Sequence, residues 1–408
     1  MSEIRCPIAF RSLVVSAAVV LVLGASPAGG VEPVRIGTHS GVIDTELAAD
    51  ETTGHLFSVL RYDEPVQDCL SVHYSADAGM SWSQPYSRCS AHGLGDHVGA
   101  ALVDDGYYVA FIDKVAVNSL KVVRMHTSNG GYDGSYGVHT VFTAPVGETI
   151  SNLSLVSNTV AFDDRLYLFA ITEGNLRFFW SDEDGGAGAE PWNEIATGVS
   201  DADPWFLDAA FNDGYWLGTT CNPIVAYQAD WDLYLWRFHG TTGAEHFVFD
   251  GALPVFERPG SIAASHDELE AVYWSYSYEV KSCSSISAGT LPVCRAWEGC
   301  DQNFASDMTV TASRVFGAAY APDNGDCLFR VRDAFGVWRG VATCHDSRPS
   351  FQGPLSVAPI PPFGPFSFGV VAVDDDPDDE TPYYFPSPVV FIDGFEIGNP
   401  SAWSGAAP

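Results

Sequence analysis

Basic residues are scarce in this sequence. It contains 19 lysines and arginines against 52 aspartates and glutamates, which gives a formal net charge of −33 over 408 residues. An electrostatic field of this sign repels nucleic acid and anionic membrane surfaces. We therefore expect neither as a partner, and we expect most of the acidic side chains to lie on a solvated surface.

Long apolar runs are lacking beyond the N-terminus. The apolar run 13–23 follows two arginines and precedes the small residues 28–30. This order is typical of a secretory signal peptide, which we expect over residues 1–30 with cleavage near Ala28 or Gly30. No later run is long enough to span a membrane. The mature chain is therefore expected to be secreted, periplasmic or on the cell surface.

Several motifs of enzymes and metal sites are also lacking. The chain has no Cys-x-x-Cys, His-x-x-x-His or Gly-x-Ser-x-Gly, and its glycine-rich run 185–188 precedes no predicted helix. These absences argue against a metal centre, a serine hydrolase and a phosphate-binding loop. We expect no cofactor, and the acidic run Asp374–Glu380 would hold Ca²⁺ only weakly.

Cysteines are present in an even number once Cys6 leaves with the signal peptide. An even number in an exported chain favours disulfides, although eight cysteines allow many pairings. Two pairs flank predicted hairpins, and we expect each pair to be bridged. They are Cys69 with Cys89 and Cys327 with Cys344.

The chain contains a repeat in which a polar turn leads into an apolar strand. Six copies occur at intervals of about fifty residues, with further alternating strands on both sides and no helical periodicity. This period is the size of one four-stranded propeller blade, so it predicts an all-β, six-bladed β-propeller over residues 31–350. Pro33–Ile36 would pair with the last blade and close the ring. The copies begin at Gly54, Gly106, Arg165, Gly214, Glu268 and Arg314.

The stretch Ser75–Trp82 is the most specific motif in the propeller region. Ser75 and Asp77 are expected to hydrogen-bond the turn's amides, Gly79 to supply a positive φ, and Trp82 to donate its indole N–H to a local carbonyl. The spacing Ser-x-Asp-x-Gly-x-x-Trp resembles the Asp-box, or BNR repeat, of sialidase-like β-propellers. In that family the motif braces a hairpin and does no chemistry.

The C-terminal region differs in composition from the repeats. Residues 351–388 are rich in proline and aspartate, which predicts a linker. Residues 389–408 contain Phe391-Ile392-Asp393-Gly394-Phe395-Glu396-Ile397-Gly398 and then Trp403-Ser404. This segment resembles the Phe-x-Asp-Gly-Phe-Glu-x-Gly…Trp-Ser tail of many secreted Gram-negative bacterial proteins. The resemblance implies export and a short irregular tail rather than an activity.

Candidate site residues follow from the propeller prediction, because ligands usually bind at one end of the central channel. The loops that lead into the innermost strands would contribute Arg35, His39, Asp44, His97, Asn152, Trp205, Arg258 and Asp307. The loops between second and third strands would contribute Asp63, Lys114, Glu173, Tyr276 and Tyr278. Of these, His97, Lys114, Trp205 and Tyr276 are the predicted ligand-binding residues.

The resemblance to sialidases implies an alternative, catalytic site. Three arginines would bind the carboxylate of the substrate, and an aspartate would act as acid/base beside a tyrosine nucleophile and its glutamate. Arg35, Arg258 and Arg314 would form this clamp, with Asp63 as the acid/base and Glu245 as the glutamate. The match is incomplete, because Gly37 replaces the proline of the Arg-Ile-Pro opening and no tyrosine follows Arg314 at the expected distance.

Two functions from different classes are therefore carried forward. The first is a monomeric, secreted, sialidase-like propeller that binds a glycan or an extracellular protein at the mouth of the channel. The second is an exo-sialidase-type glycoside hydrolase; another hydrolase or lyase with paired acids such as Asp44 and Asp63 is a third possibility. The sequence does not decide whether the protein is an enzyme.

Overall fold

The computed structural model describes most of the region between residues 34 and 386. The described residues are 34–50, 53–91, 93–103, 106–115, 118–128, 131–158, 165–182, 192–212, 222–230, 232–238, 244–250, 258–265, 268–274, 280–285, 293–296, 303–310, 316–322, 327–332, 338–344, 354–360, 368–373 and 381–386. The predicted signal peptide and the predicted C-terminal tail lie outside these ranges. No helix in the described part of the chain has the length and apolar character needed to cross a bilayer.

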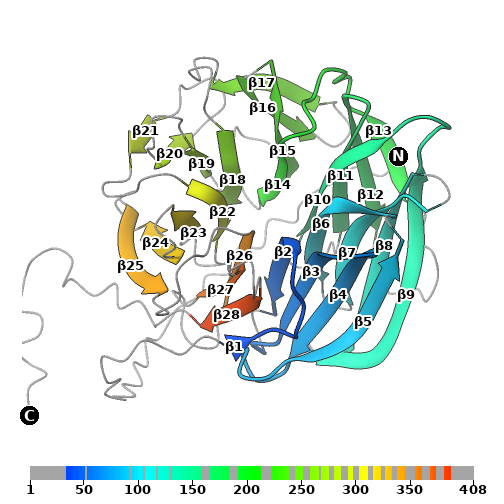
Figure 1. Cartoon of the computed structure of the whole chain (residues 1–408). Helices are drawn as coiled ribbons and strands as arrows, with labels where there is room; N and C mark the ends of the chain where they lie inside the picture. Colours follow the sequence, from blue (N-terminus) through cyan, green and yellow to red (C-terminus); the bar gives the residue numbers. More distant parts are fainter. Residues whose placement is uncertain are drawn as a thin grey trace, which may run out of the picture.

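The described residues form seven four-stranded antiparallel sheets, which are the blades of a β-propeller. Neighbouring blades contact one another through their innermost strands, from β2 through β6, β10, β14, β18, β22 and β26 and back to β2. Figure 1 shows these strands around the middle of the molecule, with β17, β21 and β25 at its periphery. The prediction of an all-β propeller is confirmed, whereas the prediction of six blades is wrong.

The first three blades follow one another along the chain, each from its inner to its outer strand. Blade 1 consists of β2 (Val42–Ala49), β3 (Leu56–Glu64), β4 (Gln67–Ser75) and β5 (Ser83–Ser90). Blade 2 consists of β6 (Leu94–Val103), β7 (Gly106–Asp113), β8 (Ser119–Ser128) and β9 (Gly131–Thr143). Blade 3 consists of β10 (Ile150–Asn158), β11 (Arg165–Thr172), β12 (Asn175–Asp182) and β13 (Asn193–Ala196).

The next three blades repeat this order. Blade 4 consists of β14 (Leu207–Asn212), β15 (Asn222–Ala229), β16 (Asp232–Phe238) and β17 (Ala244–Asp250). Blade 5 consists of β18 (Arg258–Ser265), β19 (Glu268–Trp274), β20 (Val280–Ser285) and β21 (Val293–Ala296). Blade 6 consists of β22 (Asn303–Val310), β23 (Phe316–Pro322), β24 (Cys327–Arg332) and β25 (Trp338–Cys344).

The seventh blade joins the two ends of the propeller. Its strands β26 (Leu355–Pro359), β27 (Phe368–Val373) and β28 (Pro382–Pro386) lie in the segment 351–388, so the prediction of a linker there is wrong. Its outermost strand is β1 (Val34–Arg35), which pairs with β28 through Val34 opposite Tyr384 and Arg35 opposite Tyr383. The predicted closure of the ring by this N-terminal segment is confirmed.

The repeat identified in the sequence corresponds to the second strand in five of the seven blades. This holds for β3, β7, β11, β19 and β23. Of these, β3, β7 and β11 are almost wholly buried, because neighbouring blades cover both of their faces. In blade 4 the second strand is β15, which begins eight residues after the predicted copy at Gly214; residues 214–219 lie outside the described ranges. The core consists of apolar layers between adjacent blades, for example between β7 and β10.

The turn Ser75–Trp82 has the predicted geometry. Gly79 has a φ of 89°, its N–H donates to Ser75 Oγ at 2.8 Å, and the Trp82 indole N–H donates to the Gly79 carbonyl at 3.1 Å. Asp77 Oδ1 accepts the Ser81 N–H at 2.8 Å. The Trp82 ring packs edge to face against Tyr384, with ring centroids 5.5 Å apart. Tyr384 lies on β28, here called the closing strand because it pairs with the N-terminal strand β1. The turn of blade 1 therefore also supports the closure of the ring.

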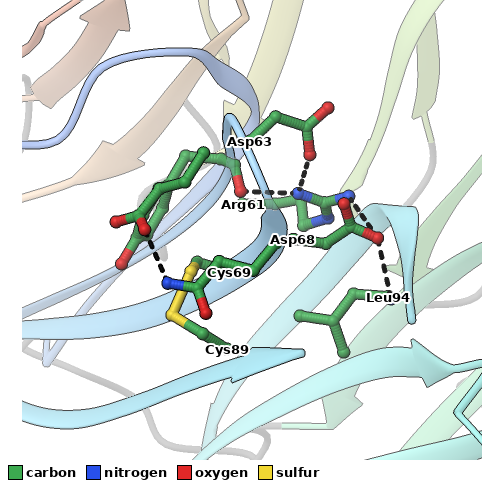
Figure 2. Close-up of a disulfide and its surroundings, with 9 residues drawn as sticks. Arg61, Asp63, Asp68, Cys69, Cys89 and Leu94 are labelled. Atoms are coloured by element: carbon green, nitrogen blue, oxygen red, sulfur yellow. Dashed lines mark hydrogen bonds and ion pairs between the residues drawn. A yellow bond between two sulfur atoms is a disulfide. The ribbon is translucent and has the colours of Figure 1, made fainter. Parts of the chain in front are cut away.

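One predicted disulfide is present, between Cys69 of β4 and Cys89 of β5 (Figure 2). The other predicted pair occupies directly opposite positions, since Cys327 of β24 pairs with Cys344 of β25. Blade 5 repeats this arrangement with Cys283 opposite Cys294. Cysteines thus occupy directly opposite positions on the third and fourth strands of three blades.

Candidate functional site

A cavity of about 180 Å³ lies on the propeller axis, at the end where the inner strands begin. Its wall is made by residues of the inner strands and of the loops leading into them, so residues far apart in the sequence meet there. Four of the lining residues are acidic, and His97 is the one basic residue among them. The polar residues discussed below are Asp44, Glu46, His97, Asn152, Asp208 and Asp307.

Aspartates in the inner strands link neighbouring blades. Each of them accepts the N–H of the residue that follows it and also an N–H from the inner strand of the next blade. A carboxylate is suited to this position because two oxygens can accept several hydrogen bonds. The cross-blade pairs are Asp44 Oδ2 with the Val98 N–H (2.9 Å), Asp208 Oδ2 with the Ile262 N–H (2.7 Å) and Asp307 Oδ2 with the Val357 N–H (2.7 Å).

Three of the axial carboxyl groups are joined by two serines into one hydrogen-bonded chain, here called the axial chain. Ser261 Oγ lies 3.0 Å from Asp208 Oδ2 and 3.2 Å from Asp307 Oδ1. Ser356 Oγ lies 3.1 Å from Asp307 Oδ2 and 3.3 Å from Glu46 Oε2. A serine hydroxyl has one proton to donate, so it satisfies both neighbours only when one of the two carboxyl groups is itself protonated.

The pKa values of the axial chain agree with this geometry. Burial, then the charge of Asp307, raises the pKa of Asp208 to about 7. Burial raises the pKa of Asp307 to about 6, against the hydrogen bonds that lower it. Burial, followed by repulsion from Asp307 and Asp44, holds the pKa of Glu46 well above its usual value. The carboxyl groups of the axial chain therefore keep their protons at pH values where exposed carboxyl groups have lost theirs.

A histidine–aspartate pair lies on the same wall. His97 Nδ1 is 3.7 Å from Asp44 Oδ2, and the two side chains are 38% and 23% exposed. Burial lowers the pKa of His97, but the neighbouring carboxylates of Asp44 and Asp96 outweigh it, so the pKa lies above its ordinary value. The carboxylate thus favours the protonated imidazole beside the cavity.

Trp205 provides an apolar rim to the cavity. Its side chain is 77% exposed, although tryptophan is usually among the more buried residues. Two hydrogen bonds hold the loop that carries it: the Trp205 N–H donates to Asp203 Oδ1 at 3.2 Å, and Asn152 Nδ2 donates to the Pro204 carbonyl at 3.1 Å. The ring is therefore presented to solvent by a structured loop.

Arg35 does not take part in the predicted arginine clamp. It lies on β1, the outermost strand of blade 7, and its guanidinium donates to Thr381 Oγ1 at 3.0 Å. The axis is lined by inner strands, so this arginine is separated from the cavity by the width of a blade. The prediction of a clamp that includes Arg35 is wrong, because the segment that carries it closes the ring instead of leading into an inner strand.

Asp63 lies outside the lining of the axial cavity. It is 53% exposed at the end of β3 and accepts from Arg61 at 2.6 Å, as Figure 2 shows. Arg61 is buried, and its Nε donates to the Gly95 carbonyl of blade 2 at 2.6 Å. Asp63 therefore neutralises an arginine that joins two blades, which is a structural role.

The other predicted site residues divide into three groups. His97 and Trp205 lie at the cavity, as do Asp44, Asn152 and Asp307. Lys114 is exposed in the loop after β7, and its charge acts on His97. Arg258 is the first residue of β18, where the structure describes no side chain, and Arg314 and Tyr276 lie outside the described residues.

Sequence reasoning missed Glu46, Asp208, Ser261 and Ser356 as members of the axial site. The available signal was a polar residue in a short apolar strand, such as Asp208 in Leu207–Asn212. That signal becomes specific only when the inner strands of all blades are aligned with one another. The sequence prediction had six blades instead of seven, so this alignment could not be made. That these residues take part in ligand binding is a prediction.

No family model matches the chain, and no curated protein matches it. Similar solved structures include the fucose-specific lectin from Aleuria aurantia, at 12% identity and a TM-score of 0.48 over 70% of this chain and 89% of that chain. AofleA from Arthrobotrys oligospora matches at 11% identity and 0.48, over 77% and 90%. Trypanosoma rangeli sialidase matches at 9% and 0.46, over 90% and 59%. Likeness at these levels concerns the propeller fold and carries no conclusion about a ligand.

Proposed function

We propose that this protein is an exported glycan-binding propeller whose axial cavity holds one sugar residue of its ligand. The observation that carries the proposal is the axial cavity of about 180 Å³ with the exposed ring of Trp205 at its rim. A sugar residue has hydroxyl groups around its edge and an apolar face. Convergent polar groups beside a large aromatic ring suit both features.

Different side chains would bind the hydroxyl groups and the apolar face of the sugar. Asn152, His97 and Asp44 offer hydrogen-bond donors and acceptors on the wall of the cavity. Trp205 offers a flat apolar surface with few rotatable bonds, so little conformational entropy is lost when a ligand stacks on it. The inner strands and their cross-blade hydrogen bonds keep the wall rigid, which favours binding by a preformed site.

An arginine-clamp hydrolase is less well supported than binding. Its first arginine, Arg35, lies on an outer strand, and its acid/base, Asp63, is paired with Arg61 away from the cavity. Without these two groups no described residues bring the expected chemistry together on the axis. We therefore do not propose sialidase activity.

The test is a glycan array with the mature protein, followed by titration calorimetry with the best ligand. Trp205→Ala should weaken binding by roughly tenfold or more, the effect of removing a central aromatic contact. Tyr136→Ala is the matched control, because it removes an exposed aromatic ring from the outer strand β9. Equal affinities of the Trp205 and Tyr136 variants, or no binding to any glycan, would contradict the proposal.

A further inference from the structure

We propose that the axial cavity selects its sugar by charge, and that it binds an amine-bearing sugar in preference to a neutral or carboxylate-bearing one. This inference rests on the proposed function and adds the chemical class of the ligand. Three features support it: the charged side chains that line the cavity, the carboxyl oxygens that are free to accept hydrogen bonds, and the protons that the axial chain would release to a bound cation.

The described lining of the cavity contains carboxyl groups from three blades and no lysine or arginine. Asp44 and Glu46 come from blade 1, Asp208 from blade 4 and Asp307 from blade 6. The imidazole of His97 is the one basic group among these described lining residues, and it is paired with Asp44. A sugar carboxylate placed here would meet carboxyl groups and, among the described lining residues, no compensating guanidinium, whereas an ammonium group would meet acceptors that become negative when their protons leave.

Glu46 is the member of the axial chain with the most unused acceptor capacity. Both oxygens of Asp208 and of Asp307 accept backbone N–H groups at 2.7–2.8 Å. Among the described residues, Glu46 has a single hydrogen bond, from Ser356 Oγ at 3.3 Å. A carboxylate accepts about four hydrogen bonds, so Glu46 is the natural acceptor for the N–H groups of a ligand.

A buried hydroxyl lies within range of the charge of Glu46 and lacks a partner. Tyr107 of β7 is fully buried, and its hydroxyl has no hydrogen bond among the described residues. Burial, and then the charge of Glu46, raises the pKa of this tyrosine well above its usual value. Tyr107 is not among the residues that line the cavity, so a ligand donor would meet the oxygens of Glu46 and not this hydroxyl.

The acidic lining suits a cation larger than a metal ion. No three of the described His, Cys, Asp and Glu residues are arranged to hold a metal. An ammonium group on a sugar ring brings three donors and its own bulk, which a cavity of about 180 Å³ accommodates. The formal net charge of −33 would also draw a cationic ligand toward the molecule from a distance.

Binding of an ammonium group should release protons from the axial chain. Repulsion between neighbouring carboxyl groups helps to raise the pKa values of Glu46 and Asp208. A bound cation offsets that repulsion and favours the ionised carboxylates. Proton release on binding is therefore a signature that a neutral sugar would not produce.

The test compares a tetramer of β-1,4-linked glucosamine with cellotetraose, in which a hydroxyl replaces each amine, and with sialyllactose. Titration calorimetry at pH 6 in two buffers of different ionisation enthalpy gives both affinity and proton release. We expect the glucosamine tetramer to bind at least about tenfold more tightly than cellotetraose, with net proton release. Sialyllactose should bind most weakly.

Two variants separate the cavity from the general charge of the protein. Glu46→Gln should reduce the ratio of affinities for the glucosamine tetramer and cellotetraose by roughly tenfold. Asp133→Asn removes one charge from the outer strand β9, and this ratio should stay within about twofold of the wild-type value. Circular dichroism checks that both variants fold. Proton release on binding is measured with the wild-type protein, so this test does not depend on either variant. Equal loss in both variants, or binding without proton release, would overturn the proposal.

The two proposals fail in different ways. Equal affinity for cellotetraose and the glucosamine tetramer, or a glycan array whose hits are all neutral or acidic, would overturn the charge selectivity and leave glycan binding in place. No binding to any glycan would overturn both.

Discussion

Single carboxyl groups on the axis contribute both to the fold and to the site. Asp208 accepts the N–H of Ile262 from the next blade while it lines the cavity, and Asp307 does the same with Val357. A side chain that joins two blades has little freedom to move. The geometry of the candidate site is therefore set by the contacts that hold the ring together.

Protons on the axial chain make the stability of the protein depend on pH. The pKa of Asp208 is about 7 and that of Asp307 about 6 in the folded protein, against an ordinary value of 3.8. The folded state thus holds protons that the unfolded state has lost. The resulting stabilisation is complete below about pH 4 and is lost as the pH rises through about 7, at about 1.4 kcal/mol per pH unit for each such group.

Urea unfolding between pH 4.5 and 7.5 measures this dependence. Asp208→Asn keeps an acceptor oxygen and carries no titrating proton, so its free energy of unfolding should fall less steeply with rising pH than that of the wild type. Asp133→Asn, at an exposed position on β9, should retain the wild-type slope. Identical slopes for all three proteins would show that Asp208 does not titrate as described.

At the residue scale the sequence predicted positions better than roles. Asp44, His97, Asn152, Trp205 and Asp307 were predicted to lie in the loops that lead into inner strands, and all five line the cavity. The roles depend on partners from other blades, such as Ser261 between Asp208 and Asp307, and a sequence pattern contains no such pairing.

Among the elements, the turn Ser75–Trp82 connects the first blade with the seventh. Gly79 has a positive φ, and a Cβ atom there would lie 2.0 Å from the ring of Tyr384 on β28. The turn therefore needs glycine for two reasons, its backbone conformation and its close approach to the closing strand.

Comparison of two glycine variants separates these reasons. Gly134→Ala imposes a similar backbone strain, at φ +96°, where a Cβ atom would meet nothing within 4 Å. We expect Gly134→Ala to cost about 1 kcal/mol of unfolding free energy, and Gly79→Ala to cost roughly 2 kcal/mol more because Tyr384 must move. Thermal and urea unfolding measure both costs. Equal costs would show that the turn does not brace the closing strand.

The outer hairpins of three blades place cysteines in directly opposite positions. Opposed residues of an antiparallel pair have Cα atoms about 4.5–5.5 Å apart, which is within the range for a disulfide. We predict bridges between Cys283 and Cys294 and between Cys327 and Cys344, in addition to the observed Cys69–Cys89.

Peptide mapping without reduction checks these pairings. Proteolysis should yield the three linked peptide pairs, each of which collapses to single peptides on reduction. Replacing both Cys69 and Cys89 with alanine should cost about 3 kcal/mol of stability. Cross-links that join different blades would contradict the register of the hairpins.

The sequence predicted strands well where they are long and apolar, as in the second strands of blades 1–3. It failed for the seventh blade because β26, β27 and β28 have only five or six residues and are separated by segments rich in proline and aspartate. These segments resemble a linker locally. The burial of every residue from Phe368 to Val373 shows that tertiary packing decides the structure there.

For the whole molecule, ring closure unites the two ends of the described chain. β1 completes a blade whose other strands are more than 300 residues away, and so the seventh blade cannot form until most of the chain is present. Closure packs the inner strand β26 of the seventh blade against β2 of the first. It also encloses the axis, where the inner strands bring acidic residues together around the cavity.

A structure of the protein with a bound glucosamine oligosaccharide would test the site most directly. We predict one sugar residue in the axial cavity, stacked on Trp205 with its amine at Glu46, and the same blade arrangement as in the free protein. A sugar bound between blades or on the outer strands, with the axial cavity left unchanged, would contradict the assignment of the axis as the binding site.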